Sequence, residues 1–157
     1  MEKMSFNELT LLANEYKKKH KNGELSITFD WEIDPEKIDL KNLNTQLVSE
    51  FIEPFFENHT IVFLDLDLVV DNKLGGNIVF PKDKLWAKRQ AEDTARVLHF
   101  VESNNKVIPP ILNIDEKYWR VIDGNHRIAV CRVFYSGKIP FFINKNGIDF
   151  IDKSFYG

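Results

Sequence analysis

Several features that would narrow the function are scarce in this chain. It has one cysteine in 157 residues, Cys131, so no disulfide can form within it, which is typical of a reducing compartment. No apolar run approaches the ~20 residues that a bilayer requires, and the polar N-terminal stretch lacks the apolar core of a signal peptide. The net charge of -3 and the pI of about 5.8 disfavour an extended DNA-coating surface. We therefore expect a cytoplasmic protein with no membrane partner.

The abundance of hydrophobic and aromatic residues indicates a globular fold. Hydrophobic residues make up 43% and aromatic residues 13% of the sequence, which is typical of a chain with a well-buried core. The length suits one domain and is short for two. No repeat, low-complexity segment or linker divides the chain. The sequence therefore predicts a single α/β domain of the α+β kind over residues 1–157.

Hydrophobic periodicity predicts the order of helices and strands. Ser5 and Glu8 have the spacing of a capping box, which predicts a helix from Ser5 to about Asn22-Gly23. The other predicted helices cover 42–58, 83–103 and 125–135, and Gly137 is expected to cap the last of them. The predicted strands cover 25–31, 60–71, 107–114, 118–122 and 139–143, with 78–80 pairing back as a hairpin. The apolar side chains of the tail are expected to dock on the body: Phe150, Ile151, Phe155 and Tyr156.

The most informative stretch runs from 121 to 130, where a predicted strand turns on an Asp-Gly pair into a helix. Glycine allows a tight turn, and the amides of a helix start favour an anion. His126 can donate to that anion or carry a proton, and the planar fork of Arg127 suits phosphate. A purely structural interpretation stays open, because Asn125 can cap the helix and Asp123 can neutralise Arg127.

Other polar residues allow both a functional and a structural interpretation. Lys84 and Lys88 lie in the first turns of a predicted helix, where they can reach a phosphate or form its solvated face. Asp65 and Asp67 would share one face of the strand 60–71 and could hold Mg²⁺, or could simply face solvent. Cys131 is expected to be a buried small hydrophobe rather than a nucleophile.

Residues 107–143 also resemble a known family. They contain, in order, Val-Ile-Pro-Pro-Ile-Leu, Tyr-Trp-Arg-Val-Ile-Asp-Gly-Asn-His-Arg-Ile-Ala-Val and Gly-Lys-Ile-Pro-Phe-Phe-Ile. The order and spacing of these pieces resemble the core of the ParB/sulfiredoxin superfamily, which also has a helix in front of them. The resemblance implies a ParB/sulfiredoxin-like mixed-sheet core over about 80–145 with an N-terminal α/β elaboration. Residues 1 to about 80 resemble no family.

The resemblance implies that a nucleotide phosphate binds at the start of the helix, on Gly124, Asn125, His126 and Arg127. The nucleotide would be ATP, ADP or CTP, with Mg²⁺ as an optional companion. Sulfiredoxins have a reactive Cys where this chain has Asn125, so their reaction is not expected. ParB partition proteins add a helix-turn-helix DNA-binding segment, for which the 14 residues after Ile143 leave no room. The motif is closest in form to ParB-like free serine kinases, which move phosphate from ADP to a small hydroxyl.

The sequence thus predicts a nucleotide-binding protein that acts as a phosphotransferase or nucleotide hydrolase. Asp123 and His126 are the predicted catalytic residues, and Lys84 and Lys88 are added to the predicted phosphate contacts. The chemistry also needs a carboxylate base, whose candidates are Asp123, Glu92, Asp65 and Asp67. Three alternatives stay open: a non-catalytic module that binds a nucleotide, a nucleic acid or a protein; a ParB-like nuclease; and a corner that serves architecture alone.

Overall fold

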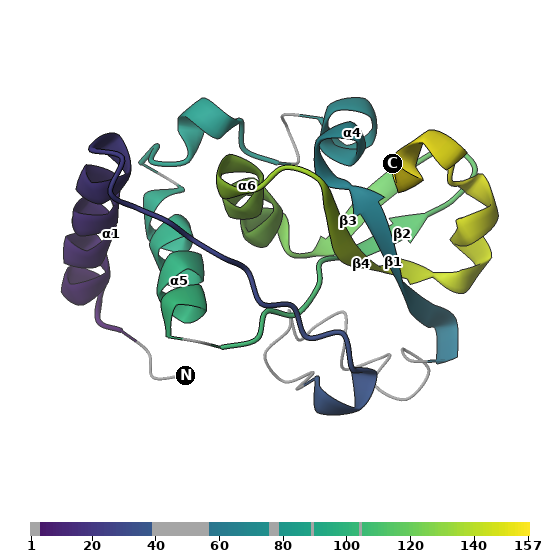
Figure 1. The fold of residues 1–157 in the computed structure, drawn as a ribbon, viewed down its shortest axis with the longest axis horizontal. Helices are drawn as coiled ribbons and strands as arrows, with labels where there is room; N and C mark the ends of the chain where they lie inside the picture. The colour runs from purple at the N-terminus through teal and green to yellow at the C-terminus, as the bar shows by residue number, and fades with distance from the viewer. Residues whose placement is uncertain (1–3, 39–56, 76–78, 89, 104) are drawn as a thin grey trace.

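A mixed sheet with a stack of helices beside it makes up the fold (Figure 1). The computed structural model describes residues 4–38, 57–75, 79–88, 90–103 and 105–157. The strands of the described residues form one four-stranded sheet in the order β1-β4-β2-β3. β4 is parallel to β2, whereas β1–β4 and β2–β3 are antiparallel. The predicted α+β class is therefore confirmed. The strands are β1 His59–Asp65, β2 Ile111–Ile114, β3 Trp119–Asp123 and β4 Lys138–Asn144.

β4 is the strand around which the core is built. Its residues 139–144 are all buried, because the strand lies inside the sheet and both of its faces are covered. Phe141 belongs to the large core cluster, while Phe142 packs on the opposite face with Ile111 and Ile38. β1 pairs with β4 along its whole length. Because β1 precedes residue 80, the sheet extends beyond the core of about 80–145 that the resemblance implies.

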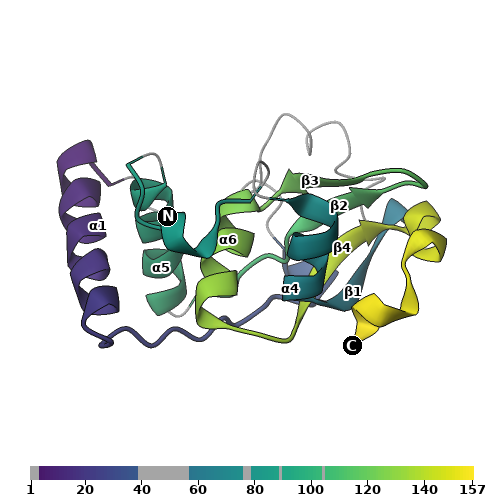
Figure 2. The ribbon, with the colours of Figure 1, turned by 90° about the horizontal axis from the view of Figure 1, so that it is seen from above.

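Three helices lie side by side next to the sheet (Figure 2). They are, in order toward the sheet, α1 Phe6–Lys21, α5 Ala91–Glu102 and α6 Asn125–Phe134. α6 is the inner helix, since Ile128 and Cys131 belong to the sheet cluster while Val130 belongs to the cluster of α1 and α5. The start of α6 is thereby held between the sheet and α5. No helix in the described part of the chain is long and apolar enough to cross a membrane.

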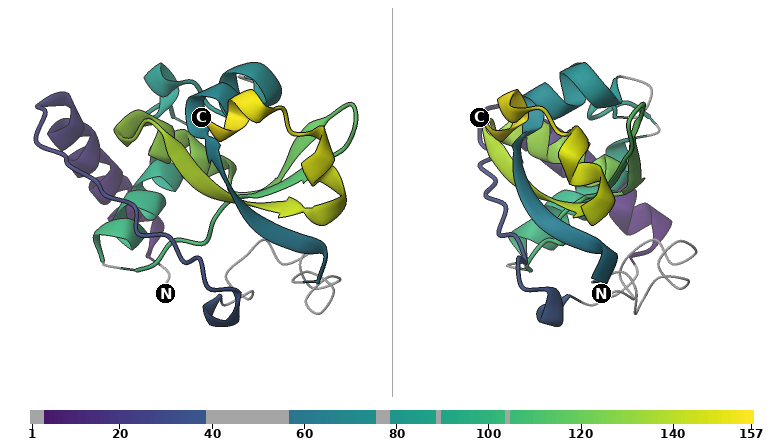
Figure 3. Two further views of the ribbon diagram at one scale, coloured as in Figure 1. Left: turned by 45° about the vertical axis from the view of Figure 1, so that its right-hand side comes forward. Right: turned by 90° about the vertical axis from the view of Figure 1, so that its right-hand side faces the viewer.

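Short helical turns complete the fold and include the C-terminal tail. The tail lies against the sheet (Figure 3), where Phe155 is buried with its ring 5.0 Å from that of Trp119. Ile151 is also buried, as predicted, but Phe150 is 46% exposed and does not dock. The short elements are α4 Leu66–Val69, a π-helical turn Val70–Leu74, and 3-10 turns at Pro35–Lys37, Lys82–Lys84, Lys145–Phe150 and Lys153–Tyr156.

Several predictions that rest on local chemistry are confirmed. The Ser5 hydroxyl oxygen accepts from the Glu8 amide at 3.2 Å and caps α1, which ends at Lys21. β2 and β3 form the predicted hairpin, and β2 begins only after the entry segment that contains Pro109-Pro110. Proline cannot donate to a strand ladder, which explains that late start. The corner from β3 into α6 and the closing strand β4 also lie where they are predicted.

The predicted strand 25–31 is wrong. Its odd-numbered side chains are the less exposed ones, as the alternation predicts, but its backbone joins no ladder apart from a bridge between Trp31 and Val107. The inward side chains instead pack on other elements, Ile27 against the α1–α5 cluster and Phe29 against both that cluster and the sheet cluster. Alternation reports which side faces the protein, and it says nothing about whether a partner strand is present.

The predicted strand 60–71 is wrong beyond Asp65. The Asp65 carboxylate accepts from the Leu68 amide at 3.0 Å and caps α4, so the chain turns into a helix there. The predicted hairpin partner does not form, because Val79 and Phe80 belong to no strand. Ile78 and most of the predicted helix 42–58 lie outside the described residues.

The predicted helix 83–103 is shorter than expected, because α5 begins at Ala91. Leu85 is buried in the helix cluster, and its carbonyl accepts from the Thr94 hydroxyl at 2.8 Å, which holds the preceding residues in a turn. The predicted cap of α6 is also wrong. α6 ends at Phe134, its C-cap Tyr135 is extended, and Gly137 lies two residues after this cap with φ of 120°.

Candidate functional site

The turn from β3 into α6 requires a glycine. Gly124 is the N-cap of α6 and has φ of 107°, a left-handed conformation that side chains disfavour. A Cβ atom on Gly124 would lie 2.8 Å from Nη2 of Arg127 and 3.0 Å from Cβ of Pro110. Gly124 thus lets the guanidinium of Arg127 pass directly over the backbone. Because the capping residue is Gly124, the structural role predicted for Asn125 is not observed, and Asn125 is exposed.

Arg127 is held firmly but is incompletely satisfied. Its Nη2 donates to Oδ2 of Asp123 at 2.6 Å, and the two side chains are only 17% and 18% exposed. Its Nε is buried and has no hydrogen-bond partner in the described residues. The ion pair of the structural interpretation therefore exists, yet it leaves part of the guanidinium without an acceptor.

His126 points toward α5. Its Nδ1 lies 2.9 Å from Oε1 of Gln90, and its Nε2 lies 3.4 Å from Oδ2 of Asp93. Gln90 is buried, and its Nε2 donates to the Thr94 hydroxyl at 3.3 Å, which in turn donates to the Leu85 carbonyl. The imidazole therefore lies between the Gln90 amide and the Asp93 carboxylate. Both ring nitrogens of His126 are thus occupied by α5 and its preceding turn.

A cleft of about 540 Å³ lies beside Arg127, between α5 and the extended segments on either side of residues 32 and 107. The backbone fixes its wall, because Glu32 N donates to Val107 O at 2.9 Å and Val107 N donates to Asp30 O at 2.7 Å. Apolar side chains make up the larger part of the lining: Ile38, Val97, Phe100, Val101, Val107 and Ile108. The charged lining consists of four cations and one carboxylate: Lys37, Arg96, Lys106, Arg127 and Glu32.

The charges of the cleft are poorly matched. Arg96 pairs with Asp93 at 3.2 Å on the surface of α5, and Arg127 pairs with Asp123. Lys37 and Lys106 form no ion pair within the residues that the structure describes. The cleft therefore has an excess of positive charge that an anionic ligand would neutralise.

Only one of the predicted site residues lines this cleft, and it is Arg127. Asp123 contacts Arg127 from behind, and His126 faces α5. Lys84 and Lys88 are exposed on the turn before α5, outside the cleft, and Glu92 on α5 does not line it either. The other charged residues of the lining were not predicted from the sequence, because they come from segments far apart in the chain.

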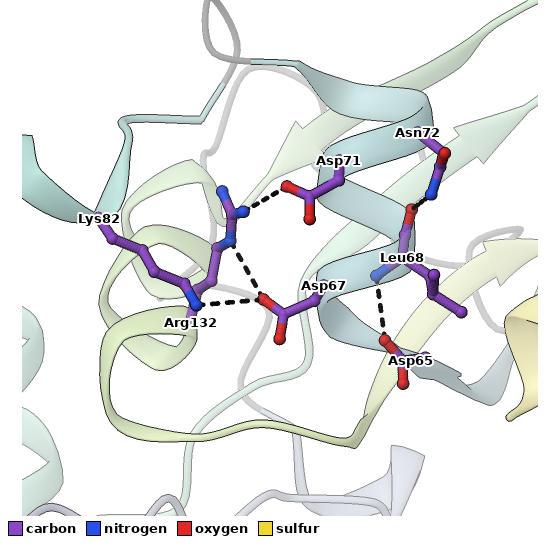
Figure 4. A network of polar contacts seen from close by, with 7 residues as sticks. All are labelled: Asp65, Asp67, Leu68, Asp71, Asn72, Lys82 and Arg132. Atoms are coloured by element: carbon purple, nitrogen blue, oxygen red, sulfur yellow. Dashed lines mark hydrogen bonds and ion pairs between the residues drawn. The ribbon is translucent and has the colours of Figure 1, made fainter.

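The expectation that Asp65 and Asp67 share one strand face is wrong. Asp65 caps α4, while Asp67 and Asp71 lie one helical turn apart and both accept from Arg132 of α6 (Figure 4). Asp67 is 3.2 Å from Nε of Arg132 and 3.6 Å from Nζ of Lys82. The described residues contain no group of three or more His, Cys, Asp or Glu side chains that could share an ion.

Cys131 is buried, as predicted. Burial among apolar residues raises the pKa of its thiol to about 12, so the thiol stays protonated and unreactive at neutral pH.

Comparison of the chain with protein-family models, with curated proteins and with solved structures finds no match.

Proposed function

We propose that this protein binds a nucleotide through its phosphate groups, in the cleft beside Arg127. The observation that carries the proposal is the convergence of four cations on one cleft that contains a single carboxylate. Phosphates carry the opposite charge and offer several acceptor oxygens, and a guanidinium can bind two of them at once. The cleft volume of about 540 Å³ lies within the range of small-ligand sites.

The start of α6 supports the same ligand. Its first amides are not used by the helix, and its dipole favours negative charge. Arg127 lies in this first turn and is the residue that joins the helix start to the cleft. The proposal extends the resemblance to the ParB/sulfiredoxin superfamily, which implies phosphate at this corner.

The geometry supports binding better than catalysis. Asp123 is engaged by Arg127, and the ring nitrogens of His126 face Gln90 and Asp93. Neither predicted catalytic residue lines the cleft, so neither is placed to move a proton of a bound ligand. The described residues contain no group of three or more His, Cys, Asp or Glu side chains for a metal, so Mg²⁺ would depend on the phosphates of the ligand for most of its ligands. We therefore propose a nucleotide-binding module rather than a phosphotransferase or hydrolase.

Calorimetry with ATP, ADP, CTP and GTP, each with and without Mg²⁺, tests the proposal. At least one nucleotide should bind, its affinity should fall as salt rises, and the nucleoside without phosphate should bind far more weakly. The absence of binding for every nucleotide would overturn the proposal. Chromatography of the same mixtures after incubation separates the two functions: intact nucleotide supports the module, and a dephosphorylated product would assign phosphoryl transfer instead.

A further inference from the structure

Phosphate binding leaves one residue of the cleft unexplained, the carboxylate of Glu32. Glu32 lines the cleft and is 8% exposed, yet it forms no ion pair with any described residue. Its Oε1 accepts from the Asp34 amide at 3.1 Å, and no described donor bonds its Oε2. Because Oε2 is not a fully buried atom and Glu32 lines the cleft, a ligand in the cleft can reach this oxygen. A hydrogen-bond donor on the ligand would supply the missing partner.

The neighbouring charges limit what that donor can be. A positively charged group on a ligand would be repelled by the cations that line the same cleft. A neutral hydroxyl is not repelled, and a carboxylate accepts from it strongly. The ribose of a nucleotide has two adjacent hydroxyls and is covalently joined to both phosphate and base. A carboxylate that accepts from a ribose hydroxyl is a recurring means of recognising nucleotides.

The apolar lining provides for the remaining part of the ligand. Val97, Phe100 and Val101 project from α5 into the cleft, with Ile108 on the adjoining segment. A flat nucleobase can pack on such a surface while the phosphates contact the cations. We infer that Glu32 accepts a hydrogen bond from the ribose of the bound nucleotide, so that the cleft selects ribonucleotides over 2′-deoxyribonucleotides. This inference rests on the proposed function.

The position of Glu32 allows a clean test. Its backbone is fixed by the Val107 carbonyl, so a change of side chain leaves that pairing in place. Glu32→Gln keeps the size of the side chain and an oxygen for the Asp34 amide, but it removes the charge. Glu36→Gln is the matched control, because Glu36 lies on the adjacent 3-10 turn, is exposed and does not line the cleft.

The experiment measures the affinity of the tightest-binding nucleotide and of its 2′-deoxy form by calorimetry. The wild type should bind the ribonucleotide about 10- to 100-fold more tightly, which is the value of a hydrogen bond to a charged group. Glu32→Gln should lower the ratio of ribonucleotide to 2′-deoxynucleotide affinity toward one, because the effect of the lost charge on phosphate binding is shared by both nucleotides and cancels in the ratio. Glu36→Gln should keep the wild-type ratio. Glu32→Asp, which retains the carboxylate, should keep part of the preference and serves as the second variant if Glu32→Gln melts early.

The outcomes separate the inference from the proposed function. Equal affinities of the wild type for the two sugars would overturn the inference and leave nucleotide binding standing. A change in the preferred base in Glu32→Gln, with an unchanged sugar ratio, would also overturn it, because Glu32 would then recognise the base. If no nucleotide binds the wild type, both the inference and the proposed function are overturned.

Discussion

The two arginines of α6 contrast in how their charges are satisfied. Arg127 and Arg132 are almost equally buried, with side chains 17% and 15% exposed. Arg132 donates to two carboxylates, those of Asp67 and Asp71 (Figure 4). Among the residues that the structure describes, Arg127 has a single carboxylate partner, and its Nε is buried without an acceptor. Burial therefore does not distinguish the two residues, whereas the supply of acceptors does.

This difference separates a structural arginine from one that is available to a ligand. A guanidinium whose Nε and one Nη each bond a carboxylate, as in Arg132, fixes α6 to the segment 66–74 and has fewer donors left for a ligand. A guanidinium that is short of acceptors, and that lines a cleft with other cations, gains most from an incoming anion. The contrast predicts that variants at the two positions affect different measurements.

The largest expected effect is on ligand binding by Arg127→Ala. The variant removes the one cation that belongs both to the cleft and to the start of α6, so nucleotide affinity should fall by about 100-fold. Arg132→Ala is the matched control on the same helix, and its nucleotide affinity should equal that of the wild type. Calorimetry at one salt concentration measures both. Equal losses in the two variants, or none in Arg127→Ala, would contradict the contrast.

Gly124→Ala should reduce both stability and binding. The new Cβ would meet Arg127 and Pro110 in a backbone conformation with φ of 107°, so unfolding free energy should fall by about 2–4 kcal/mol and the guanidinium should be displaced. Gly23→Ala is the control, since Gly23 has φ of 70° but no atom within 4 Å of its Cβ position. It should lose only about 1 kcal/mol and keep its nucleotide affinity. Urea denaturation and calorimetry test the pair.

Arg132→Ala should lower stability by about 1–2 kcal/mol, because its partners are partly exposed and the energy of each pair is limited. Asp67→Asn should cost more than Asp71→Asn, since Asp67 is less exposed, at 33% against 58%, and also contacts Lys82. The losses should shrink in high salt, which screens exposed charges. Denaturant melts at low and high salt measure these losses. A larger loss in Asp71→Asn than in Asp67→Asn would contradict the prediction.

Local patterns were sufficient to predict the corner but not the cleft. The capping serine of α1 and the Asp-Gly turn before α6 depend on neighbours in sequence, so their signals are readable there. The pairing of Asp123 with Arg127 is also between close neighbours in sequence, and it is one of the two interpretations that the sequence allows. Signals of this local kind are sufficient to predict β2, β3, α6 and β4 close to where the structure has them.

The remainder depends on which distant segments meet. Glu32 follows an alternating stretch and gives no signal in sequence that its side chain is buried beside α5. The end of β1 at Asp65 is likewise decided by a side-chain cap within a run of β-forming residues, where propensity favoured a longer strand. Local sequence preference predicts neither the burial of Glu32 nor the end of β1 at Asp65, because in both cases a competing contact overrides the pattern.

The smallest expected effect is a change in the pH dependence of the melting temperature when Asp115 is replaced. Asp115 lies in the turn before β3, and Asp123 lies at the end of that strand. Asp115 accepts from the backbone amides of Tyr118 and Lys117, and these bonds lower the pKa of its carboxyl. Because the folded pKa lies below the unfolded one, the charged form stabilises the protein above about pH 4, and this contribution disappears as the pH falls through the folded value. Asp115→Asn should therefore lower the melting temperature slightly at pH 7 and by less at pH 3, with Glu116→Gln as the exposed control. The nucleotide affinity of Asp115→Asn should stay at the wild-type value, since Asp115 does not line the cleft. A loss of affinity would show that removing a carboxylate outside the cleft also weakens binding, and a loss in Arg127→Ala would then not be specific to the cleft.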